Sequence, residues 1–153
     1  MFRRFKFEEA LYDKLEYIPL AVRRKFDLSG VSLTLAQWQS LGRGERLAIC
    51  HFPINLEEER TAFRVFIREA VERSSQSAVS LLSDSEKLAA EPPADPPPAV
   101  VESSRAAGVE LTKPLWEKLD TDERYVLLKL GSGPNVSRNF VPALKEFLQA
   151  YGA

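Results

Sequence analysis

The sequence predicts an all-α fold in which two pseudo-symmetric four-helix halves share one core and are joined by a Ser/Pro-rich linker. The stretch 30–41 returns as 108–119, an offset of 78 residues, and each copy continues into a Glu-Arg pair. Apolar residues recur at helical spacing in both copies, and no window alternates apolar and polar residues as a strand does. We therefore expect an internal duplication and no sheet.

The repeated stretch has the pattern of a helix start. In each copy a threonine is the expected N-cap, because its hydroxyl can accept a hydrogen bond from an unpaired N–H of the first turn. A leucine precedes the threonine, and a tryptophan takes the fourth helical position, which is the spacing of a hydrophobic staple. Gln37 completes a capping box in the first copy. The residues with these structural roles are Leu33, Thr34, Trp38, Leu111, Thr112 and Trp116. Packing of the indoles is favoured over the alternative, stacking on a planar ligand.

The first half is expected to begin with a short amphipathic helix over about 6–16. Pro19 then opens a second helix, which Gly30 ends. The tryptophan helix is short, and a helix of about 44–52 follows it. Asn55 is the expected cap of a long helix, whose apolar residues follow the i, i+3, i+4, i+7 pattern.

The second half repeats this order. Pro97 stands at the position of Pro19, and Asp120 is the expected cap of the next long helix, with Glu123 completing its capping box. Asn139 is the expected cap of a final helix. This last helix matches the first half at an offset of 81, which pairs Ala62, Phe66 and Ile67 with Ala143, Phe147 and Leu148.

These patterns divide the chain into an N-terminal helical half, 1–73, a linker, 74–98, and a C-terminal helical half, 99–153. The linker begins with serines and closes with a proline run, which is typical of a stiff spacer, and a weak helix over 84–91 is possible. A half of this size buries little apolar surface by itself. We therefore expect the two halves to pack together about a pseudo-two-fold axis.

The bulk composition excludes several classes of protein. A net charge of −1 over 153 residues argues against a nucleic-acid binder, which normally has a basic excess. The single cysteine, Cys50, excludes an internal disulfide and fits a reducing compartment. No stretch has the apolar length of a membrane span, and Glu8 and Glu9 interrupt the basic start where a signal peptide needs an apolar run. We expect a cytoplasmic protein that binds neither nucleic acid nor membrane.

No catalytic, cofactor-binding or metal site is predicted. Cys50 and His51 are neighbours, and adjacent side chains on a helix point about 100° apart, so they are poorly placed to share a metal ion or a proton. The glycine pairs at 42–44 and 131–133 follow no strand and lack a phosphate-loop pattern, so turns are favoured there. No pair of carboxylates is evidently placed for acid–base catalysis. We do not expect an enzyme.

The best candidates for a partner contact are basic. Arg23, Arg24 and Lys25 form a cluster with no counterpart in the second half, and Arg138 precedes the final helix. Such a patch can meet an acidic protein or an anion, although a merely solvated helix face is the more ordinary interpretation. At Arg138 an anion site competes with simple capping by Asn139.

With these residues assembled, the chain resembles the nitrate reductase-associated protein family of bacteria. The matching segments are Phe5–Glu8, Ile18–Asp27, Gly30–Trp38 and Arg138–Phe147. The Ser/Pro-rich middle lies outside the resemblance. Membership would imply a context near assimilatory nitrate reductase and molybdopterin cofactor synthesis. It supplies no catalytic residues.

Two hypotheses of different class follow. The leading one is a non-enzymatic accessory protein that contacts nitrate reductase or its molybdenum-cofactor machinery, without a cofactor of its own. The alternative is a small-ligand sensor that holds nitrate or a molybdopterin nucleotide between the halves. An enzyme of unknown type is the weakest interpretation, because it needs a pocket with convergent polar groups.

Overall fold

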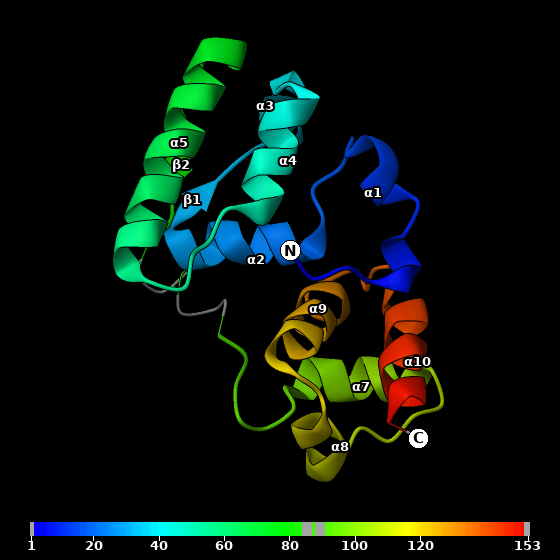
Figure 1. The fold of residues 1–153 in the computed structure, drawn as a ribbon. Helices are drawn as coiled ribbons and strands as arrows, with labels where there is room; N and C mark the ends of the chain where they lie inside the picture. Colours follow the sequence, from blue (N-terminus) through cyan, green and yellow to red (C-terminus); the bar gives the residue numbers. More distant parts are fainter. Residues whose placement is uncertain (1, 84–86, 88–90, 152–153) are drawn as a thin grey trace. The chain divides into compact units, whose positions relative to one another are not determined.

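The structure, a computed structural model, describes residues 2–83, 87 and 91–151. The described chain is mostly helical, as predicted (Figure 1). It divides into two compact units: unit 1 consists of Met1–Arg4 and Glu8–Ala90, and unit 2 of Phe5–Phe7 and Glu91–Ala153.

Unit 1 is built from helices around one apolar core. In Figure 1, α2 lies across the ends of α4 and α5, and α5 contacts both α2 and α3. The core contains the indole of Trp38 and the rings of Phe26 and Phe63. The elements of unit 1 are α1 (Leu11–Lys14), α2 (Leu20–Ser29), β1 (Val31–Ser32), α3 (Leu35–Ser40), α4 (Arg43–His51), α5 (Glu57–Ser75) and β2 (Ser80–Leu81).

The predicted boundaries of α2 and α3 are confirmed. Pro19 is the N-cap of α2, and Gly30 ends it in the left-handed region at φ +81°, which glycine adopts without steric cost. Thr34 caps α3: its hydroxyl accepts from the N–H of Gln37, and the Gln37 side chain accepts from the N–H of Thr34. Local chemistry alone determines these ends.

The predicted helix over 6–16 is wrong in its extent. A 3₁₀ turn, η1 (Lys6–Glu8), and the short α1 take its place. Leu15 ends α1 at φ +54°, a conformation that costs a non-glycine residue about 1–2 kcal/mol. The side chain of Leu15 is buried and its carbonyl accepts the indole N–H of Trp38, so tertiary contacts offset that cost.

The prediction that the fold has no sheet is also wrong, although the sheet is small. β1 and β2 pair antiparallel, with Val31 opposite Leu81 and Ser32 opposite Ser80. The N–H of Leu82 extends the pairing to the carbonyl of Gly30. Strands of two residues are too short to produce an alternating pattern, which is why the sequence gives no sign of them. Most of the possible helix over 84–91 lies outside the described residues.

The long helix α5 begins one residue later than predicted. Its N-cap is Leu56 and not Asn55, and the carboxylate of Glu59 accepts from the N–H of Leu56 at 2.8 Å. Glu59 thus makes the half of a capping box in which the third helical residue accepts from the N–H of the cap, and leucine has no side-chain oxygen for the other half. The core-facing residues of α5 are Phe63, Ile67, Ala70 and Val71.

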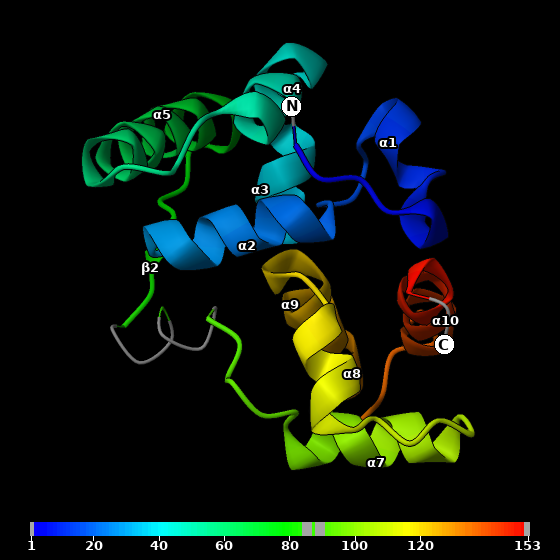
Figure 2. The same cartoon turned by 60° about the horizontal axis from the view of Figure 1, so that its bottom comes forward.

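The helices of unit 2 bury apolar side chains, among them Trp116, Tyr125 and Phe147. α9 contacts both α7 and α10 (Figure 2). The predicted caps at Thr112 and Asp120 are confirmed: the N–H of Leu115 donates to Thr112, and Asp120 and Glu123 form a reciprocal capping box. The helices of unit 2 are α7 (Pro98–Ala106), α8 (Lys113–Lys118), α9 (Thr121–Gly131) and α10 (Phe140–Ala150).

The predicted position of Asn139 at the start of the final helix is confirmed, because it is the N-cap residue of α10, but the expected capping hydrogen bond is not made. Asn139 has helical backbone angles, and its side chain accepts no hydrogen bond from the first turn. Ser137 takes the role instead, because its hydroxyl accepts from the N–H of Asn139 and its carbonyl accepts from the N–H of Phe140. A turn thus precedes the helix and satisfies its first donors.

Candidate functional site

Each tryptophan helix carries a set of polar contacts that we call a tryptophan bracket. Its first part is the indole N–H, which donates to a backbone carbonyl 23 residues earlier in the chain. Trp38 Nε1 lies 2.8 Å from the oxygen of Leu15, and Trp116 Nε1 lies 3.0 Å from that of Pro93. Both indoles have 0% exposure, so neither ring offers a face to a planar ligand.

The second part of each bracket is an arginine eight residues after the tryptophan. Arg46 Nε donates to the carbonyl of Trp38 at 3.2 Å, and Arg124 Nε donates to that of Trp116 at 3.0 Å. In both units Nη2 of the arginine binds the carbonyl of the next residue along the tryptophan helix, at 2.8 and 2.9 Å. The tryptophan carbonyl also accepts the N–H of the C-cap leucine, Leu41 or Leu119. The planar guanidinium adds a second donor there and reaches the next carbonyl of the helix end at the same time. The arginines of the repeated Glu-Arg pairs therefore stabilise the ends of the tryptophan helices.

Lys25, one of the predicted contact residues, also has a structural role. Its Nζ donates to the carbonyls of Ile49, Cys50 and Phe52, at the end of α4. A cation is favourable at the C-terminus of a helix, where the dipole is negative and carbonyls are unpaired. Desolvation lowers the pKa of Lys25. The Lys25 ammonium therefore stabilises the C-terminal end of α4 within the fold.

The other predicted contact residues are more accessible. Arg23 is exposed and Arg24 is half-buried on α2, and Arg138 is exposed ahead of α10. Arg23 and Arg24 belong to unit 1 and Arg138 to unit 2. The structure thus separates the basic cluster into one lysine that caps a helix and arginines that reach solvent.

The neighbours Cys50 and His51 diverge, as their helical spacing predicts. Cys50 is fully buried, whereas His51 is exposed and lies edge-to-face with the ring of Phe2 at 5.3 Å. Burial raises the pKa of the Cys50 thiol to about 11, against the opposing charges of Lys25 and Arg4. At neutral pH the group is a protonated thiol, which is neither a good nucleophile nor a metal ligand.

Within the described ranges, no three His, Cys, Asp or Glu side chains come together as metal ligands. Nor does any helix of the described chain combine the length and the apolar character that a membrane crossing requires.

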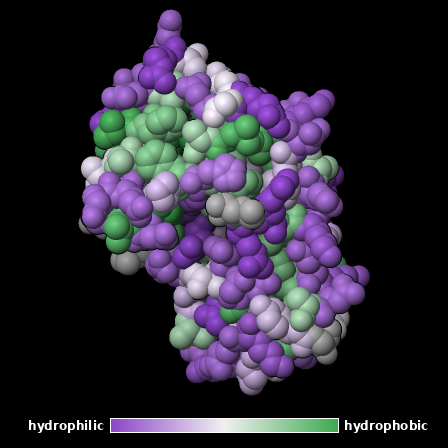
Figure 3. All heavy atoms as spheres, viewed as in Figure 1, coloured by the Kyte–Doolittle hydropathy of each residue, from purple (hydrophilic) through white to green (hydrophobic). Residues whose placement is uncertain are grey.

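Unit 1 has an apolar surface that we call the α4–α5 face. Its residues are half-buried or exposed, and they are Leu47, Phe52, Ile54, Ala62 and Phe66. Figure 3 shows hydrophobic side chains gathered over α4 and α5 on one side of the molecule. The Phe52 ring packs against those of Phe63 and Phe66, with centroids 5.3 and 5.7 Å apart. The face is therefore continuous with the core of unit 1.

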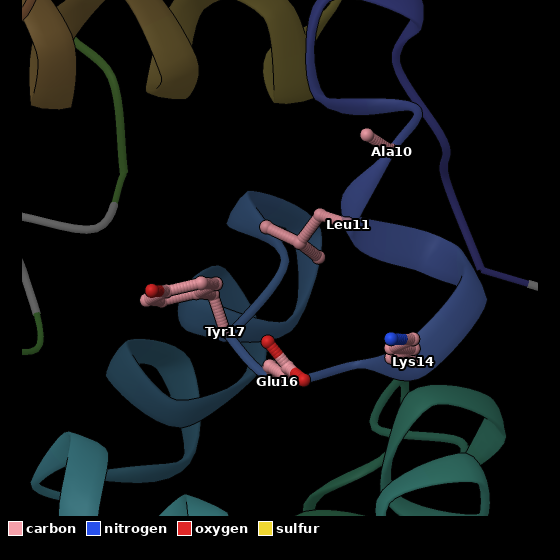
Figure 4. A pocket seen from close by; sticks show the side chains of 5 residues that line it. All are labelled: Ala10, Leu11, Lys14, Glu16 and Tyr17. Carbon is pink, nitrogen blue, oxygen red and sulfur yellow. The ribbon is translucent and has the colours of Figure 1, made fainter.

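A cavity of about 270 Å³ lies beside α1. It is lined by Ala10, Leu11, Lys14, Glu16 and Tyr17, which come from α1 and its flanking residues (Figure 4). It offers one ammonium and one carboxylate, and the carboxylate repels an anion such as nitrate. The lining has no cluster of polar groups converging on one point, which a small-molecule site needs.

In unit 2, the N-terminal segment Phe5–Phe7 covers part of α10. The rings of Phe5 and Phe7 lie 5.5 and 6.2 Å from that of Phe147. The carboxylate of Glu146 accepts from the N–H groups of Lys6 and Phe7. Sequence reasoning missed this contact by assigning the segment to a helix. The spacing of the two phenylalanines, with one residue between them, was the available signal.

Comparison with known proteins supplies the context that the geometry lacks. Residues 4–147 match the family model of the conserved nitrate reductase-associated protein. The chain belongs to this family. No curated protein matches the chain with significance, and no solved structure does. The resemblance inferred from the sequence segments is thereby confirmed, and the family links the chain to nitrate reductase by association.

Proposed function

We propose that this chain is a non-enzymatic, cytoplasmic accessory protein that acts by contact with assimilatory nitrate reductase, or with the proteins that mature its molybdenum cofactor. The observation that carries the proposal is the family match over residues 4–147, whose description names association with nitrate reductase. The non-enzymatic part of the proposal is supported by Cys50, because the one thiol of the chain is buried and protonated. The two tryptophan rings support it as well, because both are buried in the protein interior.

We further propose that the two units are copies of one helical unit. The support is that equivalent contacts recur at the offset of the sequence repeat: both indoles, both bracket arginines and the acid–backbone contacts of Glu45 and Glu123. The left-handed glycines Gly30 and Gly108 also recur at that offset. Duplication leaves each copy free to diverge on its surface while its interior stays the same.

For the contact surface, we favour the arginines over Lys25. Arg23 has no basic counterpart in unit 2, where Val101 stands at the equivalent position, and Arg138 is exposed. Arginine side chains suit carboxylates of a partner, because the guanidinium can form paired hydrogen bonds. The proposed partner surface is therefore acidic.

Affinity capture tests the proposal. The tagged full chain, expressed in nitrate-grown cells, is expected to retrieve nitrate reductase or a molybdenum-cofactor protein. Arg23→Glu and Arg138→Glu should each reduce that retrieval, whereas Arg68→Glu, at an exposed arginine on α5, is the matched control and should not. Retrieval of neither class of partner would contradict the proposed function. Equal loss in all three variants would contradict the choice of surface.

A further inference from the structure

In unit 2, one face of α10 is covered by the segment Phe5–Phe7, and this contact shows what kind of segment such a face can bind. Phe147 is only 1% exposed, and the rings of Phe5 and Phe7 pack against it. Glu146 fixes the backbone of the covering segment, since its two carboxylate oxygens lie 2.9 and 3.2 Å from the amide nitrogens of Phe7 and Lys6. The covering segment carries one cation, Lys6, between its two phenylalanines. Two aromatic rings, backbone N–H groups and one positive charge thus characterise the occupant.

Among the residues that the structure describes, none covers the matching face of α5 in this way. At the offset of 81, Phe66 corresponds to Phe147 and Ala62 to Ala143. Ala143 is fully buried whereas Ala62 is exposed, and Phe66 is half-buried where Phe147 is sealed. The difference leaves part of one aromatic ring and its neighbouring alanine open on α5.

A carboxylate lies at the edge of the uncovered face. Glu69 lies three residues beyond Phe66, on the same side of the helix, and is exposed. Glu45 of α4 is neutralised by Arg73 of α5 in an ion pair of 3.2 Å, so it adds no net charge. Val65 stands where Glu146 stands in unit 2, and Glu69 supplies a carboxylate in its place. A carboxylate beside an apolar surface favours a ligand that is basic and aromatic.

We propose that the α4–α5 face binds a short segment of a partner protein that carries two phenylalanines separated by one residue and flanked by arginine or lysine. Such a segment places one ring over Phe66 and Ala62 and its cations beside Glu69, as Phe5–Phe7 covers Phe147 in unit 2. The inference uses the proposed duplication to align the two faces. It goes beyond the proposed function, because it assigns a second, apolar contact surface and the chemistry of its ligand.

A peptide titration tests this inference. The probe is a fluorescein-labelled peptide with the sequence of residues 2–9, Phe-Arg-Arg-Phe-Lys-Phe-Glu-Glu. Anisotropy measured with the full chain should show saturable binding, and the same peptide with serine at all three phenylalanine positions should not bind. In Ala62→Lys the affinity should fall at least about tenfold, because a lysine side chain fills the face.

Thr61→Lys is the matched control. Thr61 is exposed and adjacent to Ala62, but its side chain points about 100° away around the helix. The affinity of the Thr61→Lys variant for the peptide should stay within about twofold of the wild-type value. Glu69→Lys should weaken binding and reduce its dependence on salt concentration. Circular dichroism of each variant distinguishes a blocked face from a failure to fold.

Mapping of the bound peptide by amide chemical shifts decides the outcome. Shifts on α4 and α5 that disappear in Ala62→Lys support the proposal. Shifts confined to α10 would overturn it, because the peptide would then only replace the chain's own segment. Absence of saturable binding would overturn it too. So would a concentration-dependent dimer abolished by Ala62→Lys, since a second copy would then be the occupant. The titration contains no nitrate reductase, so its result is independent of the capture experiment.

Discussion

The two tryptophan brackets resemble each other in the interior and differ at the surface. In each, the indole N–H and the arginine bind backbone carbonyls. Outside the brackets, Tyr17 and Leu35 of unit 1 are exposed apolar side chains, whereas the equivalent residues of unit 2, Asp95 and Lys113, form an exposed ion pair of 3.1 Å. The hydrogen bonds to carbonyls persist because an unpaired buried polar group is costly, whereas a surface pair contributes little and can change freely.

The largest effect is expected from removing either indole. Trp38→Ala and Trp116→Ala should each lower the free energy of unfolding by about 3–5 kcal/mol, because each leaves a cavity where a fully buried ring was. Urea denaturation followed by circular dichroism measures the loss. A loss below about 1 kcal/mol in one variant would break the comparison, since the two indoles would then not have equivalent roles.

A smaller effect should distinguish the two arginines. Arg46 donates to four carbonyls, those of Lys14 and Leu15 in addition to two in the tryptophan helix, whereas Arg124 donates to two carbonyls of its tryptophan helix. Arg46→Lys should therefore lower the free energy of unfolding by about 1–3 kcal/mol, because an ammonium cannot reproduce the paired hydrogen bonds of the guanidinium. The loss in Arg124→Lys should be smaller. The same denaturation experiment applies. A larger cost at Arg124 would mean that the number of carbonyl contacts does not determine the stabilisation.

The sequence predicted well those features that depend on neighbouring residues. The cap of Thr34, the capping box of Asp120 and the glycine end of α2 each involve partners within four residues. At Asn139 the same reasoning gave the right helix start but the wrong hydrogen bond, because Ser137, two residues earlier, forms a turn that accepts the first N–H groups. Two local motifs competed there, and the propensities of single residues do not rank them.

Contacts between distant residues were beyond that reasoning. Lys25 reaches carbonyls 24 to 27 residues away, and the sequence placed it on a solvated helix face. The packing of Phe5–Phe7 on Phe147 joins the two ends of the chain. A long flexible side chain or a short terminal segment fits many surfaces equally well, so only the assembled fold identifies its partner.

The smallest effect is expected at alkaline pH, where only unit 1 has a buried thiol. The unfolded thiol loses its proton near pH 9.0, while the folded one keeps it to about pH 11, so the folded state binds more protons in this interval. The wild type should therefore lose stability between pH 9 and 11 relative to Cys50→Ala. Lys25, whose pKa is lowered, acts in the opposite direction, but it is present in both proteins.

Denaturation of the wild type and of Cys50→Ala at pH 8 and pH 10.5 measures this difference. An equal change in both proteins would show that the Cys50 thiol is not desolvated in the fold. Leu128 stands at the equivalent position of unit 2 and cannot titrate, so the effect separates the two units.

The account depends most on two sealed indoles that donate to backbone carbonyls. The chain has two tryptophans, so its NMR spectrum contains two indole N–H signals, and their exchange in D₂O can be followed without assignment of the rest. Both signals are expected to persist for about an hour or longer at neutral pH, because exchange requires opening of the core. Loss of either signal as soon as D₂O is added would contradict the account.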